Sequence, residues 1–176
     1  MTALTPRKPV PSLEVETLDG TTWNLAEAKP DNFIMIVFYR GLHCPICATY
    51  LRDLDRKIAD FAAKGVGVIA ISTDDGDRAR DTPEQWDLEH VKIGYGIGIA
   101  KARELGLYIS SSRGKTSAGI EEPPLFNEPG VFLVRPDGDL YAALIGSMPF
   151  ARPHFSEILK ALQFIIEKDY PGRGEA

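Results

Sequence analysis

The segment of residues 33–50 constrains the fold more than any other part of the chain. It begins with seven consecutive apolar or aromatic residues, positions 33–39, which have the length and composition of a buried strand. A turn at Arg40-Gly41-Leu42 follows, and a helical pattern of apolar residues begins near Pro45. Proline suits the first turn of a helix because its missing N–H has no partner to lose there. The segment therefore predicts a strand, a turn and a helix in that order.

Cys44 and Cys47, the only cysteines in the chain, stand at the predicted start of this helix. Their spacing places them one helical turn apart, so they can close a disulfide with little rearrangement. The positive end of the helix dipole favours a thiolate over a thiol, and Arg40 and His43 are expected to add positive charge. The pair therefore predicts a redox-active dithiol, in which one thiol attacks a substrate and the other resolves the product.

Other uses of two cysteines fit the sequence less well. A structural zinc site needs about four ligands, and only His43, His90 and His154 could join the two thiols. A c-type haem needs a histidine directly after the second cysteine, where Ala48 stands, and an iron–sulfur cluster needs four thiolates. We therefore expect no metal and no cofactor. Two inert buried cysteines remain as the alternative.

The ten residues of positions 38–47, Phe-Tyr-Arg-Gly-Leu-His-Cys-Pro-Ile-Cys, resemble the thioredoxin-fold superfamily. Within it the chain is most similar to the peroxiredoxin-like branch of the alkyl hydroperoxide reductase and thiol-specific antioxidant (AhpC/TSA) group. The resemblance extends from about residue 11 to residue 168. It implies an α/β thioredoxin fold, with a central mixed β-sheet flanked by helices and an N-terminal β-hairpin. It also implies an antioxidant oxidoreductase that acts on a peroxide or a disulfide and is reduced by an external thiol, such as a thioredoxin-like or glutathione system. A homodimer is compatible with it.

The resemblance supports two assignments of the nucleophile. Typical peroxiredoxins read Phe-Tyr-Pro, three residues, Thr, two residues and then the peroxidatic cysteine. On that pattern Tyr39 matches, Arg40 replaces the proline, Cys44 replaces the threonine and Cys47 is peroxidatic. On the thioredoxin pattern Cys44 is the exposed nucleophile and Cys47 resolves. We expect Cys44, at the helix entry, to project into solvent and Cys47 to be more buried, which favours Cys44 as the thiol that attacks a disulfide.

A second region of resemblance surrounds Pro129, which stands three residues before Phe132. Thioredoxin-fold proteins carry a cis proline here that faces the cysteine pair, and the sequence leaves the cis and trans forms open. Typical peroxiredoxins also place an arginine in this region to hold the peroxide. No arginine lies between residues 116 and 134, so Arg40 is the candidate substitute, with His43 as a neighbouring supporting residue.

Three functions follow from these observations. The first is a thiol–disulfide oxidoreductase that cycles the Cys-Pro-Ile-Cys pair between dithiol and disulfide. The second is a thiol-dependent hydroperoxide reductase with Cys47 peroxidatic. The third, from a different class, is a redox-sensing binding module without catalytic turnover.

Length and composition predict one globular domain. The chain has 176 residues, of which 44% are hydrophobic and 26% charged, and a net charge of −5 argues against a nucleic-acid or anionic-membrane partner. Residues 1–11 lack the apolar core of a signal peptide, so we expect a cytoplasmic protein. We divide the chain into an extended N-terminal arm (1–11), a thioredoxin-fold domain (12–168) and a flexible tail (169–176).

Hydrophobic periodicity and turn residues predict the remaining elements. Asp74 and Asp75 follow the second apolar strand, where they favour a helix cap over an active-site role. The expected elements are a hairpin (13–23), a helix (45–64), a strand (66–72), a helix (74–89), a short strand (91–97), a helix (99–105), a long surface loop (110–128), a hairpin (131–145) and a last helix (154–167).

Overall fold

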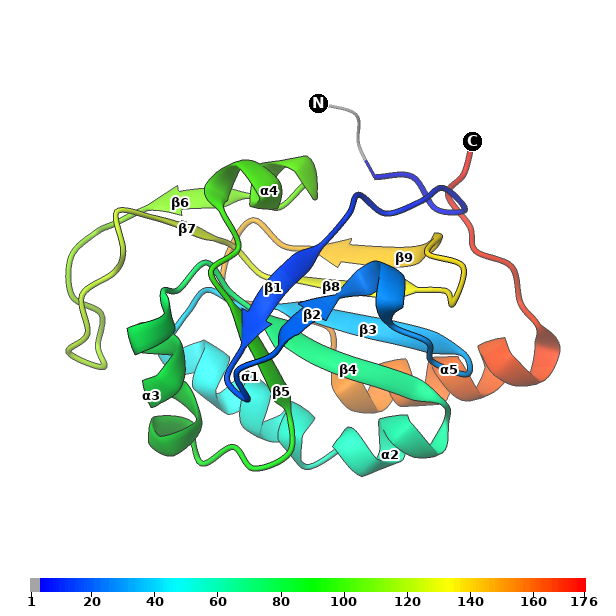
Figure 1. The fold of residues 1–176 in the computed structure, drawn as a ribbon, viewed down its shortest axis with the longest axis horizontal. Coiled ribbons are helices and arrows are strands. Elements are labelled where there is room, and N and C mark those ends of the chain that lie inside the picture. The colour runs from blue at the N-terminus through cyan, green and yellow to red at the C-terminus, as the bar shows by residue number, and fades with distance from the viewer. Residues whose placement is uncertain (1–3) are drawn as a thin grey trace.

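The computed structural model describes residues 4–176, so the first three residues of the predicted arm lie outside the described residues. Seven strands form the central sheet: β1 (Glu14–Thr17), β2 (Thr22–Asn24), β3 (Phe33–Phe38), β4 (Val66–Ile71), β5 (Lys92–Tyr95), β8 (Gly130–Val134) and β9 (Leu140–Ile145). Their order is β2-β1-β5-β4-β3-β8-β9 (Figure 1). The sheet is mixed, because β3 pairs parallel to β4 and antiparallel to β8.

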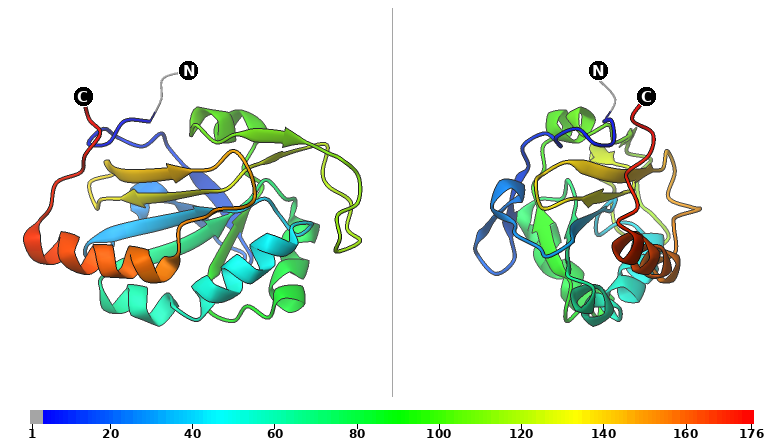
Figure 2. Two further views of the ribbon diagram at one scale, coloured as in Figure 1. Left: turned by 180° about the vertical axis from the view of Figure 1, so that it is seen from behind. Right: turned by 90° about the vertical axis from the view of Figure 1, so that its right-hand side faces the viewer.

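Helices cover both faces of this sheet (Figures 1 and 2). One face carries α1 (Pro45–Asp55), α2 (Ile58–Ala63), α3 (Gly76–Trp86) and α5 (Phe155–Lys168), and the other carries the short α4 (Ile99–Glu104). A 3₁₀ turn, η1 (Leu25–Glu27), links β2 to β3. The predicted α/β thioredoxin fold, with helices on both faces of a mixed sheet, is confirmed.

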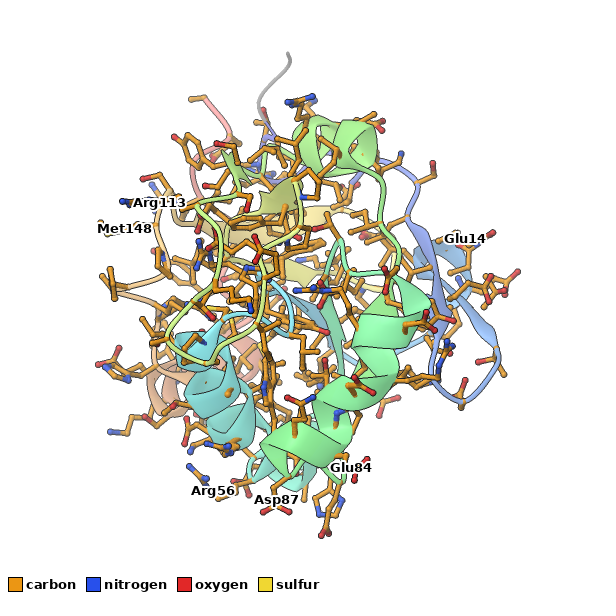
Figure 3. All side chains as sticks on the ribbon, turned by 90° about the vertical axis from the view of Figure 1, so that its left-hand side faces the viewer. Glu14, Arg56, Glu84, Asp87, Arg113 and Met148 are labelled. Atoms are coloured by element: carbon orange, nitrogen blue, oxygen red, sulfur yellow. The ribbon has the colours of Figure 1, made fainter. Side chains whose placement is uncertain are left out.

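The apolar run of β3 is explained by burial on both sides of the sheet. Met35 and Val37 pack in one hydrophobic cluster with Leu51 of α1, while Ile36 and Phe38 pack in the other. Side chains fill the space between the sheet and the helices, whereas Arg56, Glu84 and Asp87 point outward (Figure 3). β3 is thus a fully buried inner strand, and the turn and α1 follow directly from its end.

Two element predictions are wrong. The predicted helix of residues 45–64 is two helices, since the chain makes a turn at residues 56–57, where the N–H of Lys57 donates to the carbonyl of Leu54, three residues back, at 2.8 Å. The predicted loop of residues 110–128 is bounded by β6 (Ile109–Ser111) and β7 (Leu125–Asn127), which pair as a two-stranded ribbon. We call residues 109–127 the ribbon. Its connecting loop extends beyond the main sheet toward α3 (Figure 1).

The ends of the chain meet near β9. The N–H of Arg7 donates to the carbonyl of Leu140 at 2.7 Å. Residues 169–176 form no helix or strand, and the Tyr141 hydroxyl donates to the carbonyl of Tyr170 at 3.0 Å. The three-part division of the chain and the flexibility of its tail stay predictions. The predicted N-terminal hairpin is present as β1 and β2, and it joins the central sheet through β5.

Candidate active site

The two cysteines lie at the start of α1, directly after the turn that follows β3. Cys44 is the N-cap of α1, and its sulfur accepts a hydrogen bond from the N–H of Cys47 at 3.4 Å. Pro45 occupies the first turn, as expected from its missing N–H. The predicted arrangement of strand, turn and thiol-bearing helix start is therefore confirmed.

Both thiols are free and buried, Cys44 with 1% of its surface exposed and Cys47 with 0%. The expectation that Cys44 projects into solvent is wrong, whereas the expected burial of Cys47 is found. Two guanidinium groups from outside the helix, those of Arg40 and Arg152, lie against the Cys44 sulfur at 3.8 and 3.9 Å. A helix entry usually faces solvent, but here these side chains cover it.

Arg152 is the site residue that the sequence did not reveal. Its Nη2 lies 3.2 Å from the Cys47 sulfur. The guanidinium is oriented by its own Nε, which donates to the carbonyl of Pro149 at 2.8 Å, and by the ring of Tyr50, whose centroid is 5.1 Å away. Arg152 lies in the connection between β9 and α5, outside residues 116–134, where an arginine was expected. No spacing or motif in that connection marks it.

Arg40 contacts the thiol pair, as predicted, and its guanidinium also pairs with two carboxylates. Its backbone N–H donates to the Cys47 sulfur at 3.4 Å. Its side chain pairs with Glu128 at 3.2 Å and with Glu122 at 3.6 Å, and its guanidinium lies 4.7 Å from the ring centroid of Phe126. Arg40 thus links the thiols to the ribbon and to Glu128, which lies between the ribbon and β8.

His43 does not supply the positive charge that was expected of it. The side chain is buried and contacts the ring of Phe126 edge-on, with ring centroids 4.6 Å apart. The pKa of His43 is lowered from 6.5 to about 3, chiefly by burial and also by the nearby charges of Arg40 and Arg78. His43 is therefore neutral at neutral pH, because a charged imidazole would be desolvated beside two guanidinium groups.

The two thiols share one negative charge unequally. The pKa of Cys44 is lowered from 9.0 to about 6, chiefly by a hydrogen bond from the Cys47 thiol, with further help from the Cys47 N–H, Arg40 and Arg152. The pKa of Cys47 is raised, first by burial and then by its interaction with Cys44. The guanidinium of Arg152 lies closer to the sulfur of Cys47 than to that of Cys44, and this contact alone would favour a thiolate at Cys47. We assign the thiolate to Cys44 because Cys47 is enclosed on all sides and donates its S–H.

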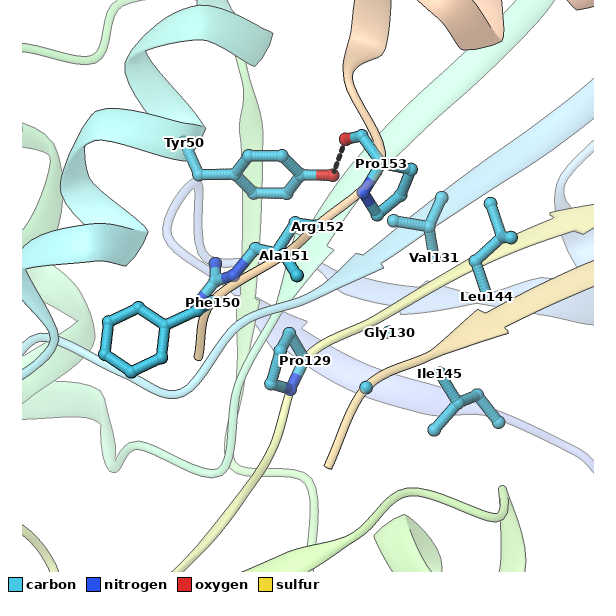
Figure 4. Close-up of a pocket in the computed structure, with 11 residues that line it drawn as sticks. Tyr50, Pro129, Gly130, Val131, Leu144, Ile145, Phe150, Ala151, Arg152 and Pro153 are labelled. Atoms are coloured by element: carbon cyan, nitrogen blue, oxygen red, sulfur yellow. Dashed lines mark hydrogen bonds between the residues drawn. The ribbon is translucent and has the colours of Figure 1, made fainter. Parts of the chain in front are cut away.

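Pro129 lines a cavity of about 340 Å³ beside Arg152 (Figure 4). Its peptide bond is trans, since the described residues contain no cis bond. The cavity is bounded on one side by Tyr50, whose hydroxyl donates to the carbonyl of Pro153 at 2.7 Å. Most of the wall is apolar and comes from β8, β9 and the β9–α5 connection, including Val131, Leu144, Ile145 and Phe150.

Asp74 and Asp75 have separate roles at the start of α3. Asp75 caps the helix, as expected, by accepting the N–H of Arg78 at 2.9 Å. Asp74 is buried and accepts the N–H of Leu42 at 2.7 Å, so it belongs to the surroundings of the thiol turn. Burial raises the pKa of Asp74.

No group of three or more His, Cys, Asp or Glu side chains in residues 4–176 is arranged to hold a metal ion. Within the same residues no helix has the length and apolar character needed to cross a bilayer. The expected absence of a metal and the cytoplasmic location stay predictions.

Comparisons with known proteins agree with this fold. The family model described as the AhpC/TSA family matches residues 6–143. The fold resembles the solved structure of peroxidoxin BcpB from Mycobacterium tuberculosis, with a TM-score of 0.70, 19% identity and coverage of 92% of this chain and 98% of that one. It also resembles AhpC from Enterococcus faecalis, with a TM-score of 0.72, 19% identity and coverage of 96% and 98%. A putative thiol:disulfide interchange protein DsbE from Chlorobium tepidum has a TM-score of 0.66, 19% identity and coverage of 92% and 97%. No curated protein matches the chain.

Proposed function

The chain belongs to the AhpC/TSA family of thiol-based oxidoreductases, and on that premise we propose that it is a hydroperoxide reductase. In this proposal Cys44 and Cys47 cycle between dithiol and disulfide. The observation that carries it is the burial of both sulfurs beneath the guanidinium of Arg152. A folded protein disulfide needs an exposed sulfur to attack, whereas a peroxide group is small enough to reach a recessed one.

The first step oxidises Cys44 and reduces the peroxide. The Cys44 thiolate attacks one peroxide oxygen, an S–O bond forms and the O–O bond breaks. The other oxygen leaves as an alkoxide or hydroxide and takes a proton from solvent, while the sulfur becomes a sulfenic acid. Arg152 supports this step, because its Nη1 is buried and has no hydrogen-bond partner among residues 4–176. That N–H group is free to stabilise charge on the leaving oxygen.

The second step uses the neighbouring thiol. The sulfur of Cys47 attacks the sulfenic acid at Cys44, an S–S bond forms and water leaves with the Cys47 proton. An external thiol reductant, either one thioredoxin-like dithiol or two molecules of glutathione, then returns two electrons and restores both thiols, and is itself oxidised to a disulfide. The thiol of Cys47 already contacts Cys44 in the reduced protein, so resolution needs little movement.

A second candidate is exchange with a protein or peptide disulfide. The lowered pKa of Cys44 at the start of α1 favours it, because a thiolate is also the nucleophile in disulfide exchange. This reaction requires Arg40 or Arg152 to move away from the Cys44 sulfur. The third candidate, a redox sensor, would show oxidation without turnover.

One preparation separates the three. Consumption of an organic hydroperoxide and reduction of a disulfide-bonded peptide are measured in parallel, each with excess small dithiol, and the Cys44→Ser, Cys47→Ser double variant serves as the blank. The proposal expects steady consumption of peroxide with little reduction of the peptide. Faster reduction of the peptide would support the second candidate, and a single stoichiometric oxidation without turnover would support the sensor.

A further inference from the structure

The carboxylate of Asp74 lies directly against the turn that precedes the thiols. Its side chain is fully buried and accepts the N–H of Leu42 at 2.7 Å. The turn wraps so closely around it that a Cβ atom added to Gly41 would lie 2.5 Å from Asp74 Oδ1. Gly41 also has a φ of 126°, which side chains rarely tolerate. Asp74 therefore fixes the path of the backbone two residues before Cys44.

Arg78 extends this contact to His43. Its Nε donates to Asp74 Oδ1 at 3.1 Å, and its Nη2 lies 3.4 Å from His43 Nδ1. A guanidinium can only donate, so Nδ1 of His43 accepts and the ring proton is on Nε2. The two residues before Cys44 are thus held by the ion pair of Asp74 and Arg78, Leu42 through its backbone and His43 through its ring.

The same arginine also holds the ribbon. Nη2 of Arg78 donates to the carbonyl of Glu121 at 3.0 Å. The next residue, Glu122, pairs with Arg40 at 3.6 Å, and Arg40 Nη1 lies 3.8 Å from the Cys44 sulfur. By binding Glu121, Arg78 fixes the position of the neighbouring Glu122. The carboxylate of Glu122 in turn holds the guanidinium of Arg40 beside Cys44.

We propose that Asp74 and Arg78 are positioning residues that hold Cys44 at the start of α1 with its hydrogen-bond donors in place. The ionisable groups that face the sulfur are Cys47, Arg40 and Arg152. Asp74 acts on the sulfur through the backbone of the turn, and Arg78 acts through His43 and the ribbon. The inference rests on Cys44 being the reacting thiolate of the proposed function.

The sign of one measurement separates positioning from simple electrostatics. Removing a negative charge near a thiol, with nothing else changed, favours the thiolate and lowers the pKa of the thiol. Loss of position has the opposite effect, because the sulfur loses the N–H and guanidinium donors that lower its pKa. Positioning by Asp74 therefore predicts a rise in the pKa of Cys44 when the carboxylate is removed.

The test follows the rate of alkylation of Cys44 against pH in the full-length reduced protein, with the modified site identified by mass spectrometry. In Asp74→Ala the midpoint is expected to rise by about one pH unit, which lowers the rate at pH 5 about tenfold. Asp74→Asn keeps an acceptor for the Leu42 N–H and is expected to fall between wild type and Asp74→Ala. Arg78→Gln, which leaves the carboxylate in place, is expected to shift the midpoint in the same direction.

Asp55→Asn is the matched control. Asp55 is another buried carboxylate that holds a turn, since it accepts the backbone N–H groups of Glu89, His90 and Val91. This variant is expected to lose stability and keep the wild-type midpoint. An unchanged or lowered midpoint in folded Asp74→Asn and Arg78→Gln, or an equal shift in Asp55→Asn, would overturn the inference. Because alkylation needs no peroxide, its outcome is separate from that of the turnover assay.

Discussion

Nη2 of Arg152 lies 3.2 Å from the sulfur of Cys47, although 105 residues separate the two in the chain. The contact is made by the connection between β9 and α5, which returns over the start of α1. The same nitrogen lies 3.9 Å from the Cys44 sulfur, so one positive charge serves both thiols. A segment distant in sequence thus supplies the cation that the cysteine motif requires for a stable thiolate.

Arg152 is predicted to govern the reaction with peroxide. Arg152→Ala should slow oxidation of the thiols by an organic hydroperoxide about ten- to a hundredfold, because a hydrogen bond to a charged group contributes roughly 1.5–3 kcal/mol. Arg152→Lys should fall between, since it keeps the charge and loses the planar fork of donors. Stopped-flow measurement of thiol loss gives the rates. Arg56→Ala, which removes a largely exposed arginine near the other end of α1, should oxidise as wild type does. Wild-type rates in Arg152→Ala would refute this role.

Gly41 is predicted to tolerate no side chain. Gly41→Ala would place a methyl group 2.5 Å from Asp74 Oδ1 at a φ of 126°, so it should cost at least about 1–3 kcal/mol of stability. Urea denaturation measures the free energy of unfolding. Gly98→Ala is the control, because its φ is −67° and no atom lies within 4 Å of the added carbon. It should cost less than about 1 kcal/mol. Equal losses in the two variants would argue against the close contact.

His43 is predicted to make the protein acid-sensitive. The pKa of His43 is 6.5 in the unfolded chain, taken as the reference value, and about 3 in the folded protein. Between these pH values the imidazole is therefore protonated in the unfolded chain and neutral in the folded protein. Stability therefore falls as pH drops from about 6.5 toward 3, by at most about 1.4 kcal/mol per pH unit from this group. His43→Gln should flatten that part of the stability profile, measured by urea denaturation between pH 7.5 and 4.5. His154→Gln is the matched control and should leave the profile as it is, because this exposed residue makes no side-chain cap hydrogen bond and the variant keeps the buried ring of His43. An unaltered slope in His43→Gln would show that the buried ring is not responsible.

The parts of the fold and site that are local in sequence could be predicted. The apolar run that becomes β3 and the proline in the first turn of α1 are sufficient to place Cys44 and Cys47 at a helix start. Short-range signals also locate α4, which ends before Gly106, and the β8–β9 hairpin.

The remaining features depend on contacts between distant segments. A cysteine at a helix entry usually faces solvent, and nothing near Cys44 in the sequence shows that Arg152 covers it. His43 was expected to be charged for the same reason, since its burial against Phe126 of the ribbon is a tertiary contact. The sequence of the ribbon resembles that of a loop because β6 and β7 are three residues each, too short for an alternating pattern to stand out among serines, glycines and prolines.

The account depends most directly on Cys44 being the thiolate that attacks. The decisive measurement is the rate at which each single-cysteine variant forms a sulfenic acid with dilute organic hydroperoxide at pH 7, trapped by a sulfenic-acid reagent and located by mass spectrometry. Cys47→Ser keeps a hydroxyl donor beside Cys44 and is predicted to form sulfenic acid there at a rate near that of thiol loss in wild type. Cys44→Ser leaves a buried thiol with a raised pKa and is predicted to react much more slowly. If Cys44→Ser instead forms sulfenic acid at Cys47 as fast as the wild type loses thiol, Cys47 is the peroxidatic residue and the assignment is reversed.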